Sequence, residues 1–395
     1  MLTSLTLVVI ASISAPTAAN TKPLKIAFLS AEPTQIASLT ETVEKFQALY
    51  PDQTIELSTY SDARFKAAIH NWLKKGDFDI IHWQAGERLF RLVTQDLVAP
   101  INSLMDVDLI RHHYKSVNLQ QLSRDGQLYG LPLAVYIWGF YYNKSVFAAL
   151  DLQPPKTWQD FKHIARVLKQ NSIKPLVQAN QSEWETLAWL DYLSLMEGGE
   201  TLRTKMVHGD PIGADKASEL LAPLTELIDK EYFFAPDHEW SWVQAVAAVA
   251  RGHAGMTLSG LFIEESLNTV LGNEVGFFAF PDSHRYGTVA PLDMLMIAKN
   301  STNKPAAAKF LEYLATTSSS DKLALSLGWL PTSSHPLTNS LTERQERALA
   351  TITSAPILVQ YFDRDTDAKR SMMLDKHLDT LFASRNSKPL IDSIK

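Results

Sequence analysis

The chain has 395 residues, the length of two or three domains or of two lobes with separate cores. Its 43 acidic and 37 basic residues give a net charge of −6, so neither nucleic acid nor an anionic membrane surface is an expected partner. Cysteine is absent, which excludes disulfides, thiol catalysis, cysteine zinc sites and a lipid-anchored cysteine. The composition is that of a globular protein, and its nine tryptophans are the unusual count.

Residues 1–19 contain no charged side chain, and the apolar run from Leu5 to Ile13 is followed by small residues up to Ala19. This pattern predicts a secretory signal peptide, cleaved after Ala18 or Ala19, although it lacks the usual basic residue near its start. No later stretch is long and apolar enough to cross a membrane. We therefore expect an exported, periplasmic protein that is not a lipoprotein.

The first hundred residues alternate between strand and helix periodicity. Three short apolar strands and two amphipathic helices are predicted in the order β-α-β-α-β: Lys25–Leu29, Ile36–Leu49, Ile55–Thr59, Phe65–Leu73 and Asp79–Trp83. This order indicates a parallel sheet covered by helices on both faces. Ligands of such sheets bind beyond the carboxyl ends of the strands, so the loops that begin at Ser30, Tyr60 and Trp83 are expected to border a site.

The chain from about residue 140 is mainly helical. Helical spacing covers 158–170, 184–196, 214–230, 242–251 and 305–316, and the charged tail 342–382 is also expected to be helical. Two short apolar strands are predicted at 277–281 and 294–297. Without a flexible linker between the two regions, we expect two lobes joined by several crossings, with a cleft between them.

Common catalytic and nucleotide-binding motifs are absent from the sequence. It contains no phosphate-binding glycine loop, no dinucleotide fingerprint, no serine-hydrolase elbow and no zinc-protease motif. The eleven histidines are scattered, and the adjacent His112 and His113 cannot share one helix face. We therefore expect no metal and no cofactor, while a pair of carboxylates for glycoside hydrolysis is not excluded by spacing.

A series of short motifs resembles the family 1 extracellular solute-binding proteins of ABC transporters, the group that includes the maltose-binding protein. The motifs are Asp125–Pro132, Tyr142–Lys144, Pro154–Trp158, Asp79–Trp83, Arg251–Met256, Ala306–Leu314 and Gly328–Pro331. Along the chain these motifs follow one another in the order typical of that family. The resemblance extends from residue 25 to about 335. The last 60 residues are less distinctive.

The resemblance implies a fold and a function. The fold is the two-lobed α/β periplasmic-binding-protein (Venus flytrap) fold, in which each lobe is a mostly parallel sheet flanked by helices. The expected first lobe is 24–135 plus 283–318, and the expected second lobe is 136–282 plus 319–395. The implied function is not enzymatic: the monomeric protein closes its lobes around a carbohydrate, expected to be an oligosaccharide, and delivers it to a membrane ABC permease.

The same resemblance implies ligand contacts on both walls of the cleft. On the first-lobe side they are Trp83, Glu87, Arg88 and Asp293; at the hinge, Tyr136 and Trp138; on the second-lobe side, Glu183, Trp184, Trp240, Trp242 and Phe262. Tyr136, Phe262 and Asp293 stand where the maltose-binding protein and many of its relatives carry other residues, which argues against maltose itself.

The residue types suit a sugar. Aromatic rings pack on the apolar face of a pyranose, and carboxylates or arginine form directional hydrogen bonds with its hydroxyls. Trp83 is the leading candidate for stacking, whereas Trp72, Trp158 and Trp189 are expected to be packing residues.

Three alternatives stay open at this point. The protein could sense its ligand for a receptor kinase instead of a permease. An aromatic cleft with carboxylates such as Glu183 and Asp293 could bind a polyamine through cation–π contacts. A secreted glycoside hydrolase would need two facing carboxylates, one of them with a raised pKa.

Overall fold

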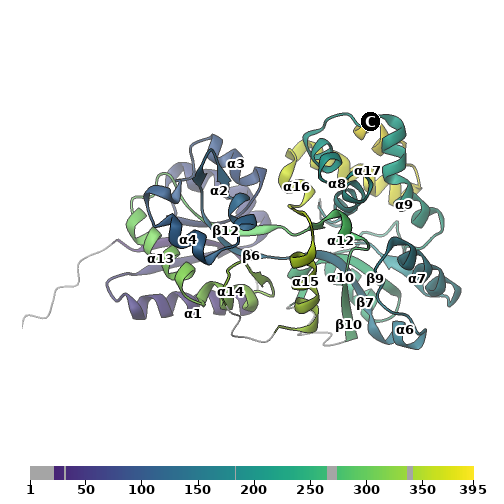
Figure 1. Ribbon diagram of the computed structural model, residues 1–395, viewed down its shortest axis with the longest axis horizontal. Helices are drawn as coiled ribbons and strands as arrows, with labels where there is room; N and C mark the ends of the chain where they lie inside the picture. The colour runs from purple at the N-terminus through teal and green to yellow at the C-terminus, as the bar shows by residue number, and fades with distance from the viewer. Residues whose placement is uncertain (1–21, 31–32, 183, 265–273, 336–340) are drawn as a thin grey trace, which may run out of the picture.

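The computed structural model describes residues 22–30, 33–182, 184–264, 274–335 and 341–395. The expected signal peptide and Glu183 lie outside these ranges. The described chain forms two lobes side by side (Figure 1). Among its helices, none is long and apolar enough to cross a membrane.

The first lobe is built on a six-stranded sheet with the strand order β13-β6-β12-β3-β1-β2. The first three strands, β1 (Leu24–Leu29), β2 (Ile55–Tyr60) and β3 (Ile80–Gln84), are parallel, as the β-α-β-α-β pattern predicts. The other strands, β6 (Leu131–Val135), β12 (Leu292–Ile297) and β13 (Leu330–Pro331), add antiparallel pairs. The helices of this lobe are α1 (Pro33–Leu49), α2 (Asp62–Lys75), α3 (Glu87–Thr94), α4 (Val107–His113), α5 (Ser116–Gln120), α13 (Lys304–Thr316) and α14 (Ser319–Ser326).

The second lobe contains a four-stranded sheet with the order β10-β7-β9-β8. Its strands are β7 (Trp138–Asn143), β8 (Lys174–Val177), β9 (Ala254–Gly260) and β10 (Val275–Ala279). Its larger helices are α7 (Trp158–Gln170), α8 (Ala188–His208), α9 (Ala214–Asp229), α10 (Trp242–Ala250), α15 (Glu343–Ser354) and α17 (Ala368–Ser384). Helix α7 begins at a capping box, in which Thr157 Oγ1 accepts from the amide of Asp160 and the Asp160 carboxylate accepts from the amide of Thr157.

The lobes are joined by several crossings of the chain. One runs from β6 directly into β7, and another returns from β10 through β11 (Thr288–Val289) to β12. Strand β11 pairs with β14 (Leu358–Val359), which forms a two-stranded sheet at the hinge. The chain therefore passes between the lobes more than once.

Two expected lobe boundaries differ from the structure. The sequence-based boundary places 283–318 in the first lobe, but α12 (Ser283–Tyr286) packs on α8, so the first lobe resumes only at β12. At the other end, α14 packs on α1 and β13 pairs with β6, which keeps the chain in the first lobe to Pro331. The sequence hides both shifts because strand partners, not local periodicity, decide to which lobe a short segment belongs.

Candidate functional site

A cavity of about 320 Å³ lies between the lobes. The first lobe contributes Leu29, Asp62, Lys66, Gln84 and Arg88; the second lobe and the segment after β14 contribute Ser182, Trp184, Trp242, Phe262, Tyr361, Asp363 and Arg364. The first-lobe residues come from the ends of β1 and β3 and from the helices that follow β2 and β3. They lie where the topology of a parallel sheet places a ligand.

One wall of the cavity is aromatic. Trp184 and Phe262 meet edge to face at a centroid distance of 5.5 Å, and Trp242 meets Phe262 in the same way at 6.0 Å. Tyr361 lies parallel to Trp184 at 6.2 Å. Such rings offer flat apolar area with little conformational freedom to lose on binding.

Trp138 supports this wall from behind. It is 1% exposed and meets the rings of Trp184 and Tyr361 at nearly right angles, with centroids 5.8 and 5.2 Å away. Trp184 reaches the cavity because α8 begins at Ala188, four residues later than the sequence predicts. The tryptophan therefore lies in the preceding turn and not in the helix.

The opposite wall is polar, and its charges are paired. Arg88 donates to Gln84 Oε1 at 2.5 Å and to Asp363 Oδ2 at 2.6 Å, so this guanidinium joins the two lobes. Lys66 pairs with Asp62 one helical turn away at 2.8 Å. The described charged side chains of the wall therefore form mutual ion pairs and leave little net charge for a ligand to neutralise.

Arg364 is the most buried of these charges. Its guanidinium donates to Asp293 Oδ1 at 2.8 Å and to the hydroxyl of Tyr136, and it lies 5.0 Å from the ring centre of Tyr361. Burial raises the pKa of Asp293, but the charge of Arg364 and the contact with His82 lower it further, so this pKa lies below its ordinary value. Asp293 is therefore an ionised support for Arg364.

Two polar atoms of cavity-lining residues are buried and have no hydrogen-bond partner among the described residues. They are the hydroxyl of Tyr361 and Oδ1 of Asp363. A buried polar atom without a partner is costly, so such atoms in a cavity wall indicate groups that a ligand can satisfy. A phenol and a carboxylate oxygen are suited to a hydroxyl, which both donates and accepts.

The structure brings four of the predicted site residues into the cavity wall: Arg88, Trp184, Trp242 and Phe262. Three others lie behind that wall. Tyr136 and Asp293 hold Arg364, and Trp138 packs beneath the aromatic rings. Glu183 lies outside the described residues.

Three predicted residues lie elsewhere. Trp83 is 6% exposed and stacks on Phe65 in the core of the first lobe, because the side chain next to Gln84 on β3 points to the opposite face of the sheet. Glu87 pairs with Arg124 within the first lobe at 2.7 Å. Trp240 packs on Phe234, with its ring nitrogen donating to a backbone carbonyl at 3.0 Å.

The residues that sequence reasoning missed are mainly Tyr361, Asp363 and Arg364. They follow β14 within the charged tail, around the short helix α16 (Phe362–Asp365). The available signal is local: Tyr361–Asp365 combines two aromatic and three charged residues and is separated from the strand-like pair Leu358–Val359 only by Gln360.

No group of three or more histidine, aspartate or glutamate side chains suited to a metal ion is found in the described ranges.

Comparison with known proteins points to one family. Residues 30–319 match the family described as bacterial extracellular solute-binding proteins. An uncharacterized ABC transporter extracellular-binding protein of Pyrococcus horikoshii is 25% identical over 292 residues, which cover 71% of this chain and 66% of that one. The multiple sugar-binding protein of Streptococcus mutans is 27% identical over 224 residues, covering 53% of each chain. The chain thus spans between half and two thirds of the length of these relatives.

Solved structures resemble the chain over nearly its whole length. The bacterial solute receptor AcbH, described as exclusively preferring β-D-galactopyranose, superposes with a TM-score of 0.84 at 22% identity, covering 94% of this chain and 96% of that one. A chitin oligosaccharide binding protein gives 0.79 at 19% identity, with coverage of 94% and 97%. These likenesses confirm the predicted two-lobed α/β fold.

Proposed function

The chain belongs to the bacterial extracellular solute-binding protein family, and from that premise we propose that it captures a neutral carbohydrate between its lobes and delivers it to an ABC permease. The arrangement that carries this proposal is the aromatic wall of Trp184, Trp242 and Phe262 beside the unpaired Tyr361 hydroxyl and Asp363 oxygen. A pyranose presents an apolar face to rings and hydroxyls to polar atoms, so one ligand can satisfy both. The match to a multiple sugar-binding protein supports the same class of ligand.

The paired charges favour a neutral ligand over a polyamine. A cation would gain most from carboxylates without a partner, but Asp62, Asp363 and Asp293 already face Lys66, Arg88 and Arg364. The ion pairs leave neutral hydrogen bonding and ring stacking as the main sources of affinity. The protein then acts as a binding protein and not as an enzyme.

The cavity size favours a short sugar. Its volume of about 320 Å³ lies at the lower end of the roughly 300–1,000 Å³ found for ligand pockets. We therefore narrow the expected oligosaccharide to a mono- or disaccharide. Capture outside the cytoplasm, after removal of the signal peptide expected in residues 1–19, is part of this proposal.

A thermal-shift screen of the purified protein tests the ligand class. Monosaccharides, disaccharides, longer oligosaccharides and spermidine are compared at equal concentration, since any ligand that binds only the folded state raises the melting temperature. A shift with a short neutral sugar and none with spermidine supports the proposal. A shift with spermidine alone would contradict it, and release of free sugar from a bound glycoside would instead indicate a hydrolase.

Delivery to a permease is tested in cells. Deleting the gene should abolish uptake of the sugar that binds, and the wild-type gene should restore it. Normal uptake after deletion, with loss of a transcriptional response to the sugar, would favour the receptor-kinase alternative.

A further inference from the structure

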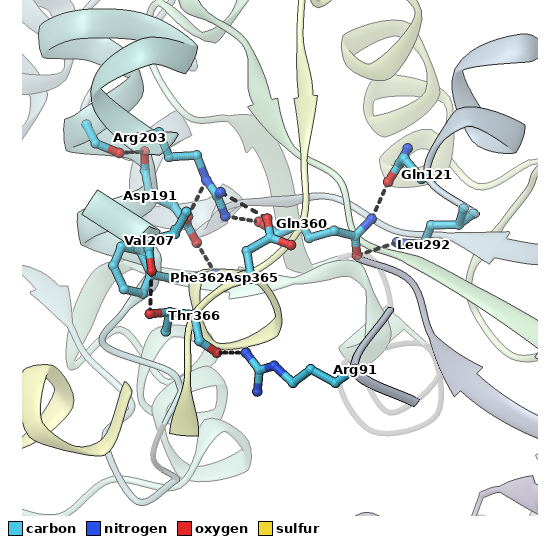
Figure 2. A network of polar contacts seen from close by, with 11 residues as sticks. Arg91, Gln121, Asp191, Arg203, Val207, Leu292, Gln360, Phe362, Asp365 and Thr366 are labelled. Carbon is cyan, nitrogen blue, oxygen red and sulfur yellow. Dashed lines mark hydrogen bonds and ion pairs between the residues drawn. The ribbon is translucent and has the colours of Figure 1, made fainter. Parts of the chain in front are cut away.

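The segment Gln360–Thr366, which we call the strap, includes α16 and lies between the two lobes (Figures 1 and 2). One side of it forms part of the ligand cavity through Tyr361, Asp363 and Arg364. Its remaining contacts fall outside that cavity, and they divide into an attachment to the second lobe and an attachment to the first.

The attachment to the second lobe is a buried network on α8 (Figure 2). Asp191 accepts from the amide of Phe362 at 2.8 Å and from Arg203 Nε at 2.9 Å. Arg203 also donates to the carbonyl of Gln360 at 2.7 Å and to the carboxylate of Asp365 at 2.9 Å. Asp191 and Arg203 are 1% and 4% exposed, so separating this ion pair from the strap would leave several of its buried hydrogen-bonding groups unsatisfied.

A further bond ties the end of the strap to the same helix, because Thr366 Oγ1 donates to the carbonyl of Val207 at 2.6 Å. Arg203 and Val207 reach the strap since α8 is interrupted at Gly199, whose φ of 62° is not helical. With both ends fixed to α8, the strap moves as part of the second lobe.

One contact with the first lobe lies at the hinge. Gln360 Oε1 accepts from the amide of Leu292 at 3.2 Å, and Leu292 begins β12 directly after the hinge strand β11. This bond fixes the side chain of Gln360 beside the crossing of the chain.

Two other first-lobe contacts come from residues that lie outside the crossing segments. Arg91 on α3 donates to the carbonyl of Thr366, and Gln121, directly after α5, accepts from the side-chain amide of Gln360 (Figure 2). The start of α3 lies close to the strap, since a Cβ added to Gly86 would lie 2.6 Å from Asp365 Oδ1. Both Arg91 and Gln121 are partly exposed, and neither lines the ligand cavity.

We propose that Arg91 and Gln121 form a latch on the strap that holds the lobes together before ligand binds, and so set ligand affinity from outside the cavity. Two half-exposed hydrogen bonds, one of them from a charged donor, shift the equilibrium between open and closed lobes by roughly tenfold or more. This favours the closed arrangement but still allows the lobes to open. Apparent affinity scales with the fraction of molecules in the binding-competent arrangement, so the same factor appears in the dissociation constant. The effect on ligand affinity rests on the proposed function, whereas the effect on lobe closure does not.

The test measures the distance between the lobes without ligand. Because the chain has no cysteine, Asn71→Cys on α2 and Ser218→Cys on α9 introduce the only two thiols for nitroxide labels. Pulsed electron–electron double resonance then compares three proteins that carry both labels: the otherwise unchanged chain, Arg91→Ala/Gln121→Ala and the matched control Arg124→Ala. Arg124 is also a first-lobe arginine, but its carboxylate partner, Glu87, lies in the same lobe.

The double variant should increase the population with the longer interlobe distance by roughly tenfold, while Arg124→Ala keeps the parental distribution. Gln121→Ala alone should give a smaller shift in the same direction, which keeps the test decisive if the double variant folds poorly. An unchanged or shortened distribution in the double variant, or an equal change in Arg124→Ala, overturns the latch. This measurement needs no ligand, so it tests the latch independently of the carbohydrate proposal. The thermal-shift screen with sugars tests the carbohydrate proposal.

Discussion

The carboxylate of Asp293 lies 2.8 Å from the guanidinium of Arg364, and both side chains are almost fully buried. The pair joins β12 of the first lobe to the helix that borders the cavity. It therefore stabilises the hinge and also holds the guanidinium of Arg364 in position at the cavity.

Asp293→Asn should destabilise the protein by about 3–5 kcal/mol, because it leaves the buried charge of Arg364 without its counterion. Urea unfolding measures the change. Asp62→Asn is the matched control, since it breaks the more exposed pair with Lys66 and should cost at most about 1 kcal/mol. Equal losses in the two variants would contradict the structural role of Asp293.

Trp184→Ala should mainly weaken sugar binding, whereas Trp83→Ala should mainly lower the stability of the fold. Trp184 borders the cavity, so its loss should weaken sugar binding by about 1–3 kcal/mol with little effect on unfolding. Trp83 is packed on Phe65, so its loss should destabilise the first lobe by about 3–5 kcal/mol. Calorimetric titration and thermal unfolding of both variants separate the two effects. Loss of sugar affinity in a stable Trp83→Ala would restore Trp83 to the site.

Tyr361→Phe should weaken sugar binding by about 0.5–1.5 kcal/mol and should not destabilise the ligand-free protein. The reason is that the Tyr361 hydroxyl is buried and has no partner in the described part of the chain, so a ligand can supply its hydrogen bond. The measurement is a pair of titrations and melting curves. A clear loss of stability would show that this hydroxyl has a partner within the protein.

Glu185 should make stability depend on pH near neutrality. Burial raises its pKa to about 7 from an ordinary value of 4.5, although a bond from the amide of Ser182 lowers it. The folded state therefore binds the proton more tightly than the unfolded state, and stability falls as pH rises from about 4.5 through 7, by about 1.4 kcal/mol per pH unit at most.

Glu185→Gln removes this dependence. The melting temperature of the wild type should fall relative to that of Glu185→Gln between about pH 4.5 and 7. A constant difference between the two proteins over that range would show that Glu185 titrates as an ordinary carboxyl group.

The sequence predicted the first lobe well because its elements have clear periods. The five segments from Lys25 to Trp83 appear in the structure within a few residues of their expected bounds, and their order identified the edge of the sheet that borders the cavity. Family resemblance adds Arg88, Trp184, Trp242 and Phe262, which come from four separate segments and line one cavity only in the folded chain.

Two parts of the site have no local signature in the sequence. The face of β3 toward which Trp83 points depends on the register of the sheet, which a five-residue apolar strand does not reveal. The role of Arg364 depends on Asp293 and Tyr136, which lie 71 and 228 residues away along the chain. No local pattern links such residues, so the sequence of the tail predicts only a charged helix.

The central claim is that both lobes hold one short neutral sugar in the cavity between them. The most direct measurement is a calorimetric titration of the best sugar from the screen against the wild type, the first-lobe variant Arg88→Gln and the second-lobe variant Trp242→Ala. We predict one sugar bound per chain and a loss of affinity of roughly tenfold or more in each variant. Unchanged affinity in both variants would contradict the claim, because the ligand would then bind outside this cavity.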